Sequence, residues 1–349
     1  MSIKNSAGDQ VRLNIKNDQT YTLTVALAFA SIGNAVMQGY TTTVGDLGKA
    51  TFTSNLVSAT QYTVAANINA QFVDLIFAST GASSSQLMFS TTSTVDVVFL
   101  RCVFRGSRSS GLVNQGNGGI VIAIECESYD CNKGNVATAA GFQVSGSGGG
   151  MFCYNCYSHD HAAGTNAHGY SSASSATLIL VNSIGDTCAG SGVNLSSTGH
   201  IISIGSNYYN NSVDGIKIAM SGAAAWCVMM NNNFLKNTGA GVNCTTTSQG
   251  GILYNNGRGA GSQANGSADT LQCIVDTSTD ITYASGDTPW NAPATGDFTT
   301  IPTSAARSAG RGAFTETDGT NTGTVAYPDI GAAQALVTPE LRIPSIASI

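Results

Sequence analysis

The stretch GYSSASSATLILVN, residues 169–182, contains two short β-like runs, the first opened by a glycine and the second closed by an asparagine. This pair of runs returns at a period of about 25 residues, which is typical of a coiled solenoid of short strands. In such a coil the apolar side chains point into a narrow stacked core, and their polar alternates face water. The sequence therefore predicts an all-β parallel solenoid. The glycine-led starts of its middle coils are Gly141-Phe142, Gly169-Tyr170, Gly192-Val193, Gly215-Ile216 and Gly241-Val242.

Three parts of the chain follow from this pattern. Residues 51–266 are predicted to form the parallel β-helix, with roughly eight coils. Residues 1–50 are a leading segment, and residues 267–349 are expected to form a C-terminal cap with loops and an extended tail. That last part holds all six prolines of the chain. This placement is expected, because a strand inside a sheet cannot lose an amide donor.

A short amphipathic helix is predicted within the leading segment, over residues 23–37. The apolar side chains there recur at helical spacing, although the stretch is too short to span a bilayer. Such a helix would close the open end of the solenoid and cap its core. The residues that mark successive turns of its stripe are Leu23, Leu27, Ala30 and Asn34.

The balance of charge excludes several classes of protein. The chain has 14 lysines and arginines and a formal net charge of −6, so no basic surface is expected to neutralise phosphates. We therefore expect no nucleic-acid partner, no membrane insertion and no cofactor. Residues 1–9 lack a basic region followed by an apolar one, so no secretory signal is predicted. The nine cysteines are an odd number and lie among apolar residues, which favours reduced thiols in a cytoplasm.

Two columns of residues are predicted to repeat from coil to coil. Cys102, Cys126 and Cys156 occupy equivalent places, and their small thiols suit an inward-facing stack better than disulfides or a metal site. Asparagines close successive strand runs, where they tolerate left-handed backbone angles and stack their amides. These residues are predicted to form a structural ladder at a corner: Asn155, Asn182, Asn231 and Asn255.

Asp130, Asp160 and Asp186 are the candidate catalytic residues. They follow aligned strand runs by three or four residues, and stacked strands lie about 4.8 Å apart. Two such carboxylates would stand close enough for glycoside hydrolysis, with Asp130 or Asp160 as the acid and the other as base or nucleophile. The alternative is that these aspartates form turns and bond to their own backbone.

His159 and His161 are the candidate metal ligands. An H-x-H pair on one strand would place both imidazoles on the same face, beside Asp160 or Asp186. The alternative is a solvated loop, because the flanking residues are small. No metal is predicted on this pattern alone.

The order of these parts resembles the right-handed parallel β-helix proteins of tailed phages and environmental bacteria. The matching strings are GYTTTVGD at residues 39–46, VDLIF at 73–77 and YPDIGAAQ at 327–334, the last preceded by DFT at 297–299 and SAGRG at 308–312. The resemblance implies a right-handed coil. This group of proteins includes phage spike, fibre and capsid-surface proteins as well as polysaccharide lyases and hydrolases, so the resemblance implies no single activity.

The favoured interpretation is a structural virion protein of a tailed phage, either decorating the capsid or forming part of a spike or fibre. Its expected partners are other capsid or tail subunits, further copies of itself in a homo-oligomer such as a trimer, and a host-surface glycan. It would be assembled in the host cytoplasm and act in the virion. The alternative is a polysaccharide-degrading enzyme, a lyase or a glycoside hydrolase, that uses the three aspartates.

Overall fold

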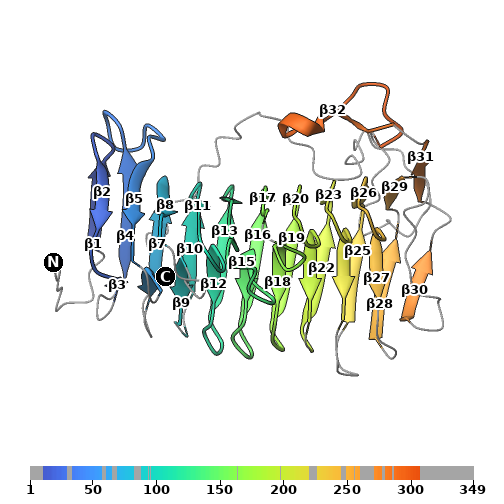
Figure 1. Ribbon diagram of the computed structural model, residues 1–349, viewed down its shortest axis with the longest axis horizontal. Coiled ribbons are helices and arrows are strands. Elements are labelled where there is room, and N and C mark those ends of the chain that lie inside the picture. Colours follow the sequence, from blue (N-terminus) through green and yellow to red (C-terminus); the bar gives the residue numbers. More distant parts are fainter. Residues whose placement is uncertain are drawn as a thin grey trace, which may run out of the picture.

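Three long parallel sheets wrap around one core and run the length of the molecule (Figure 1). The computed structural model describes residues 11–306, except 30–33, 57–59, 65–68, 82–87, 93, 95, 163, 197, 220–225, 245–248, 255, 260–270, 277–279 and 285–286. Successive strands join different sheets, so that each coil adds one strand to each sheet in turn. The architecture is the right-handed parallel β-helix that the sequence predicts.

We name the sheets A, B and C. Sheet A has eleven strands, β1 (Val11–Lys16), β4 (Ala35–Tyr40), β7 (Ala70–Val73), β10 (Val97–Leu100), β13 (Ile120–Ile124), β16 (Gly150–Tyr154), β19 (Thr177–Val181), β22 (His200–Ile204), β25 (Trp226–Met230), β28 (Gln249–Tyr254) and β30 (Leu271–Asp276). Sheet B has eleven strands, β2 (Thr20–Leu23), β5 (Ala50–Ser54), β8 (Leu75–Ser79), β11 (Val103–Arg105), β14 (Glu127–Tyr129), β17 (Tyr157–His159), β20 (Ile184–Asp186), β23 (Asn207–Tyr209), β26 (Asn233–Leu235), β29 (Gly257–Gly259) and β31 (Ile281–Tyr283). Sheet C has nine strands, β3 (Leu27–Phe29), β6 (Tyr62–Val64), β9 (Phe89–Thr91), β12 (Leu112–Asn114), β15 (Ala140–Val144), β18 (His168–Ser172), β21 (Val193–Leu195), β24 (Ile216–Ile218) and β27 (Val242–Cys244).

Aromatic rings stack from coil to coil in the N-terminal half of the core. The ring centroids of Phe72 and Phe99 lie 5.0 Å apart, and those of Phe77 and Phe104 lie 5.6 Å apart. Phe89 of sheet C meets the ring of Phe77 edge-on at 5.0 Å. All five rings are buried. Because a slip of one residue would turn each ring out to solvent, this stack fixes the register of the coils.

Single residues with left-handed backbone angles turn the chain between sheets A and B. Asp74, Arg101 and Glu125 have φ values of 55°, 52° and 53° at this corner, and Asn155 and Asn182 follow with 52° and 50°. A second such corner follows sheet B in each of the middle coils. Left-handed angles cost little for asparagine and more for other residues. The remaining corner positions are therefore held in place by the strands on either side.

The predicted N-terminal helix is wrong. Strands β2, β3 and β4 contain Leu23, residues 27–29 and residues 35–37 of this stretch, and they pair in parallel with β5, β6 and β7. Ala30 lies outside the described residues, and Leu23 and Leu27 are strand residues packed against the core. Each strand here gains backbone hydrogen bonds to the next coil, and these outweigh a helical spacing of apolar residues. Strands of the coil thus begin at Val11, earlier than the predicted boundary at residue 51, and continue to Tyr283, beyond residue 266.

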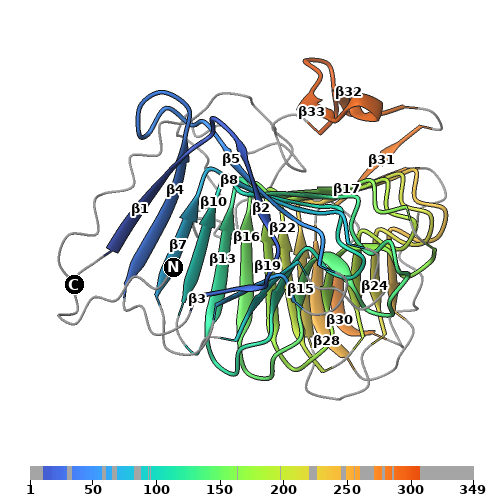
Figure 2. The ribbon, with the colours of Figure 1, turned by 60° about the vertical axis from the view of Figure 1, so that its left-hand side comes forward.

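A C-terminal segment folds back over the outside of sheet B. It comprises β32 (Trp290–Ala292), the short 3₁₀ helix η1 (Pro293–Thr295) and β33 (Asp297–Thr300), with β32 and β33 antiparallel. Figures 1 and 2 show this segment above the edge of the coil, outside its core. The expected tail beyond residue 306 lies outside the described residues. Within the described ranges, no helix is long and apolar enough to cross a membrane.

The expectation that polar alternates face water is wrong for the middle strands of sheet C and for most of sheet A. In sheet C the outward positions are polar but buried, since Gln143, Ser171 and Asn194 are 8%, 0% and 7% exposed. In sheet A both alternates are apolar from β10 to β28, as in β19, where Leu178 is fully buried and Ile179 next to it points outward. Sheet A is therefore apolar on both its inner and its outer face over these strands, whereas the expected alternation predicted a polar outer face.

Candidate functional site

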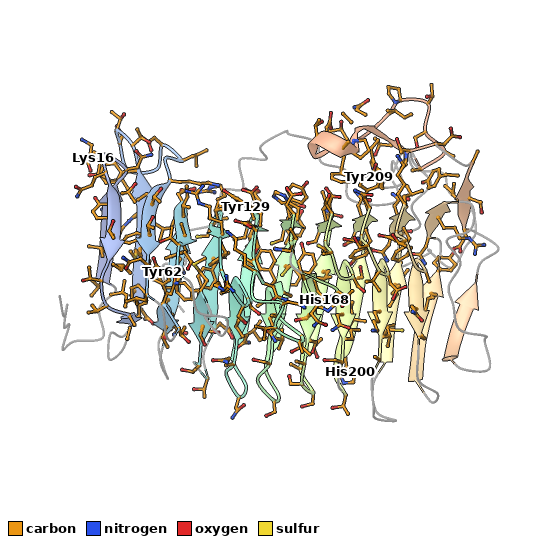
Figure 3. The ribbon with its side chains drawn as sticks, in the orientation of Figure 1. Lys16, Tyr62, Tyr129, His168, His200 and Tyr209 are labelled. Atoms are coloured by element: carbon orange, nitrogen blue, oxygen red, sulfur yellow. The ribbon has the colours of Figure 1, made fainter. Side chains whose placement is uncertain are left out.

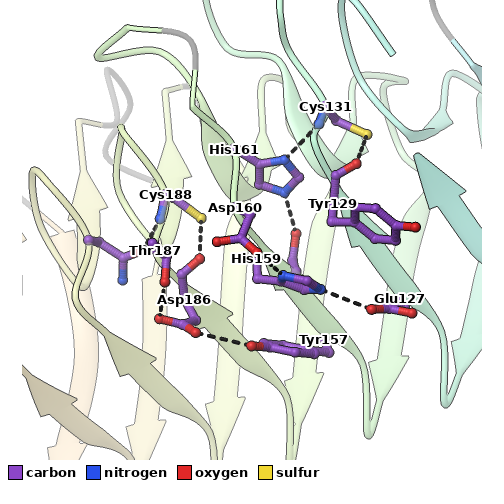
Figure 4. Close-up of polar contacts among 12 residues, drawn as sticks. Glu127, Tyr129, Cys131, Tyr157, His159, Asp160, His161, Asp186, Thr187 and Cys188 are labelled. Carbon is purple, nitrogen blue, oxygen red and sulfur yellow. Dashed lines mark hydrogen bonds and ion pairs between the residues drawn. The ribbon is translucent and has the colours of Figure 1, made fainter. Parts of the chain in front are cut away.

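Titratable side chains gather on the outer face of sheet B, in the consecutive strands β14, β17 and β20. The middle residue of each strand points inward, as its complete burial shows for Ser128 and Ser158. The first and third residues therefore point outward, and the register brings those of neighbouring strands side by side. The corner after β17 adds one more carboxylate. We call the resulting group the His159 cluster (Figure 4): Glu127, Tyr129, Tyr157, His159, Asp160 and Asp186.

His159 lies at the centre of the cluster and bridges two carboxylates. Its Nδ1 lies 2.8 Å from Oδ2 of Asp160, and its Nε2 lies 3.0 Å from Oε1 of Glu127. Burial alone would lower the pKa of His159, but these two partners outweigh it and raise the pKa above its usual value. The hydrogen bond from His159 also lowers the pKa of Glu127, against the effect of burial. Since both ring nitrogens face carboxylates, the imidazole is held as a cation.

Asp186 and Tyr157 form a second polar contact beside this bridge. The hydroxyl of Tyr157 donates a hydrogen bond of 3.1 Å to Oδ2 of Asp186, and Thr187 donates to Oδ1 at 2.6 Å. Burial raises the pKa of Asp186 to about 6, despite these two donors. Burial and the charge of Asp186 also raise the pKa of Tyr157. At neutral pH the pair is therefore a neutral phenol next to a carboxylate that takes up a proton in mild acid.

Aromatic rings line the cluster on either side of the imidazole. The rings of Tyr157 and His159 are stacked with centroids 4.0 Å apart, and Tyr129 stacks on the other side at 5.4 Å. The hydroxyl of Tyr129 accepts a hydrogen bond of 2.9 Å from Nη1 of Arg105. A row of flat rings along neighbouring coils gives a surface on which planar or ring-shaped ligands pack well.

The C-terminal segment forms a wall next to the cluster. Phe298 meets the ring of Tyr157 edge-on at 6.2 Å, and Trp290 packs against Phe298 at 5.1 Å. Both side chains are buried on the apolar outer face of the later sheet B strands, where Tyr209 contacts each of them. Figure 3 shows Tyr129 and Tyr209 on this same upper side of the coil. The cluster therefore lies where the covered part of sheet B ends and its polar part begins.

The three predicted aspartates do not form one column. Asp130 and Asp160 share the corner after sheet B, with φ values of 54° and 53°, but Asp186 lies one position earlier, on β20 opposite His159. Asp130 is ion-paired with Lys133 at 2.5 Å. The structure thus brings Asp160 and Asp186 to His159 and keeps Asp130 apart. The corner position of the third coil is Thr187, with a φ of 50°, four residues after Ser183, whereas Asp186 is only three residues after it.

The predicted metal pair is separated by the corner at Asp160. His159 ends β17 and faces outward, whereas His161 is completely buried. Nδ1 of His161 accepts a hydrogen bond of 3.1 Å from the backbone N–H of Cys131, so Nε2 donates to Oγ of Ser158 at 2.9 Å. Burial lowers the pKa of His161 to about 3. The expectation that both imidazoles share a face is therefore wrong, and no group of metal-ligating residues occurs among the described residues.

The columns of small polar residues lie inside the coil. Cys102, Cys126 and Cys156 are all buried and follow the corner residues of successive coils. Hydrogen bonds between later coils run through the same place: Oδ1 of Asn232 accepts from the N–H of Ser206 at 2.9 Å, and Oδ1 of Asn256 accepts from the N–H of Asn232 at 2.9 Å. This amide ladder lies one residue after the predicted one.

The predicted asparagines themselves occupy the corner. Asn155, Asn182 and Asn231 have φ values of 52°, 50° and 56°, and Asn255 lies outside the described residues. Asparagine was expected at a corner because it tolerates left-handed backbone angles, and these three residues have such angles. The sequence signal for the inner ladder is the doubled asparagine, as in Asn231-Asn232, whose second member faces inward.

Glu127 and Tyr157 were missed as site residues. Neither stands out in the sequence, because each belongs to an ordinary strand alternation. The signal that could have found them is their equivalent position: each directly follows an aligned column cysteine, Cys126 or Cys156, and therefore begins a strand of sheet B.

Comparisons with known proteins show the fold and no family. No family model matches the chain, and no curated protein matches its sequence. Among solved structures, pectate lyase Pel9A is similar with a TM-score of 0.56 and 16% identity, over 93% of this chain and 87% of that chain. The A-module of mannuronan C-5 epimerase AlgE4 from Azotobacter vinelandii follows with 0.53 and 14% identity, over 74% and 71%. The Dettilon tailspike protein gp208 has a TM-score of 0.45 and 12% identity, over 80% and 62%.

Proposed function

We propose that this protein acts on a polysaccharide that lies along the outer face of sheet B and passes in front of His159. The observation that carries the proposal is the convergence of three carboxylates, one imidazole and two tyrosines from consecutive coils. The solved structures named for pectate and mannuronan share the fold, which supports a glycan as the ligand class. A long, straight sheet with repeated aromatic rings suits a chain of sugar rings.

The protonation states in the cluster suit general acid–base cleavage. Glu127 has a lowered pKa and stays ionised, while Asp186 has a pKa of about 6 and carries a proton in mild acid. Two carboxyl groups whose environments push their pKa values apart can serve as base and acid in one reaction. The charge of His159 keeps Glu127 ionised, and the hydroxyl of Tyr157 lies within reach of Asp186. Hydrolysis is therefore the reaction that these groups support.

The test is incubation of the purified protein with neutral and acidic polysaccharides. Hydrolysis releases reducing ends, whereas elimination produces an unsaturated sugar that absorbs in the ultraviolet. We expect reducing ends, with kcat/KM lowered about 100-fold or more in Asp186→Asn and His159→Gln, as for loss of an acid–base group. The control is Asp130→Asn, which removes an exposed carboxylate paired with Lys133 outside the cluster.

Two results would count against the proposal. Cleavage that survives both cluster substitutions would place the active site elsewhere. If no polysaccharide of either class is bound or cut, the proposed function itself is wrong. An unsaturated product would keep the site and replace hydrolysis by elimination.

A structural role on the surface of a tailed phage, as a capsid decoration or as part of a spike or fibre, is our second proposal. It is supported by the continuous hydrogen-bonded stack, which gives a rigid body, and by thiols that form no disulfides among the described residues. Such a protein would be present in a fixed copy number on purified particles, which quantitative mass spectrometry measures. Its absence from the particles would refute this role, and the glycan site could serve either function.

A further inference from the structure

The outer face of sheet A is apolar over seven consecutive strands, from β10 to β28. Two columns of outward side chains run along it, one starting at Val98 and the other at Leu100, as the parallel register shows. We call this surface the sheet A face. Its members are Val98, Ile122, Phe152, Ile179, Ile202, Val228 and Ile252 in one column, and Leu100, Ile124, Tyr154, Val181, Ile204, Met230 and Tyr254 in the other.

These side chains are outward-facing and do not belong to the core. Their inward neighbours, such as Leu178 and Ile201, are fully buried, whereas most members of the face stay partly exposed and Ile252 is 38% exposed. Ile120, at the margin of the face, is 44% exposed. None of the members carries a charge. Nothing in the described part of the chain packs over them, since β32 and β33 lie on sheet B (Figure 2).

The same chain covers its other apolar outer surface. On sheet B, the outward residues Ile184, Tyr209 and Leu235 are apolar and lie under the C-terminal segment that contains Trp290 and Phe298. In the middle of sheet C the outward residues Gln143, Ser171 and Asn194 are also buried, at 8%, 0% and 7% exposed. An apolar sheet face in this fold is therefore expected to have a partner, and sheet A lacks one within the described chain.

The size of the sheet A face matches what two copies of a protein need to associate. Strands about 4.8 Å apart and about five residues long give seven strands roughly 550 Å² of flat area. Two such faces together bury at least about 1,100 Å², which exceeds the roughly 1,000 Å² that a specific interface requires. Stable self-associating interfaces are also the most apolar ones.

We propose that the sheet A face is an interface between copies of this chain. Two faces pack against each other as layers of a β-sandwich do, about 10 Å apart and with strand directions within about 30°. The contact is self-complementary, because an uncharged apolar surface meets its own copy without repulsion between like charges. The glycan site on sheet B stays open in this arrangement, so this inference does not depend on the proposed function.

The test is the molar mass of the full chain in solution, measured by light scattering over a range of concentrations. We expect a mass of at least twice the 35.6 kDa of one chain, falling to one chain in Ile202→Lys. A buried lysine in the middle of the interface would face its own copy and be repelled. The double variant Ile179→Thr/Ile202→Thr keeps β-branched side chains in both strands and should raise the dissociation constant at least tenfold. The control is Thr63→Lys, an outward position on sheet C.

Circular dichroism of each variant establishes that the coil is still folded. A wild-type protein that is monomeric at every concentration would overturn the inference, as would an oligomer whose mass is unchanged in both sheet A variants. In Ile202→Cys, an alkylating reagent should reach the new thiol much faster than the buried Cys153 at concentrations far below association. Equally slow modification of both thiols would mean that another part of the same chain covers the face, and it would also overturn the inference.

Discussion

His159 and His161 are two residues apart, yet the corner at Asp160 gives them opposite surroundings, which favour a cationic ring at His159 and a neutral ring at His161. The pKa of His159 is raised between two carboxylates, whereas burial lowers the pKa of His161 to about 3. Asp160 has a left-handed backbone angle where an extended residue would continue the strand, and this angle changes the direction of the next side chain. At this scale, the direction of a side chain depends on one backbone angle that the residue types alone do not reveal.

Replacing Glu127 with glutamine should lower the pKa of His159. The carboxylate at 3.0 Å is one of the two groups that raise that pKa, and an amide carries no charge. In the wild type, the stabilisation from the protonated ring is complete below its unfolded pKa of about 6.5 and is lost as pH rises through the higher folded pKa. In the variant the folded pKa is lower, so this stabilisation is smaller and its loss should be complete at a lower pH.

The measurement is an NMR titration of the histidine ring protons, with His159→Gln used to assign the signal. Asp130→Asn serves as the control, because Asp130 pairs with Lys133 and has no contact with the ring. An unchanged titration in the glutamine variant would mean that the contact with Glu127 does not hold the charge of His159.

The cysteines and asparagines that repeat from coil to coil could be placed from the sequence to within one position. Cys102, Cys126 and Cys156 align because each precedes a strand of sheet B, and their burial agrees with small inward thiols. Asp186 was placed in the wrong column because it is the last residue of β20, one position before the corner residue Thr187, and so aligns with Tyr129 and His159. An error of one residue reverses the face of a strand, so a site on such a surface needs coordinates even when the fold does not.

At the scale of elements, the period of about 25 residues predicted the repeating strands, and local spacing misled only where the pattern was weak. The leading residues Leu23 and Leu27 match a helix as well as they match two strand ends. Parallel pairing with the next coil decides between them, and that pairing is invisible in the segment itself. The predicted alternation of apolar and polar residues also failed to indicate the apolar outer face of sheet A, because strands that are apolar on both sides show no alternation.

The C-terminal segment is an element held by a few aromatic contacts, and Trp290→Ala should release it. Trp290 is 2% exposed and packs on Tyr209 and Phe298 at 5.6 and 5.1 Å. Removing a buried tryptophan costs about 3–5 kcal/mol. Since the segment lies outside the coil, the loss should appear as faster hydrogen exchange in residues 290–300 with little change in the middle coils.

Ala294→Ser, an exposed position in η1, is the matched control and should exchange like the wild type. If Trp290→Ala instead lowers the melting temperature of the whole coil, the segment contributes to the stability of the stack as well as covering part of sheet B.

At the scale of the molecule, the three sheets divide the surface by chemistry. Sheet C has polar outward positions that are buried in its middle strands, sheet B carries the His159 cluster next to its covered apolar part, and sheet A has uncharged apolar columns from β10 to β28. Because every coil repeats the same three strands, each property extends along the molecule as a stripe. A partner or a polymer that binds one stripe therefore leaves the others accessible.

A stack in which each coil contacts only its neighbours should open from its ends, and the buried thiols can report this. Cys244 lies in β27, at one end of sheet C, whereas Cys153 lies in β16, near the middle of sheet A. Both are buried, with exposures of 6% and 0%. In dilute urea we expect an alkylating reagent to modify Cys244 at least tenfold faster than Cys153, because opening the last coils exposes it first. Mass spectrometry of the peptides measures the two rates, and full denaturation should make all nine cysteines react. One common rate for both would mean that the coil unfolds as a single cooperative unit, and the nearest-neighbour picture of its stability would be wrong.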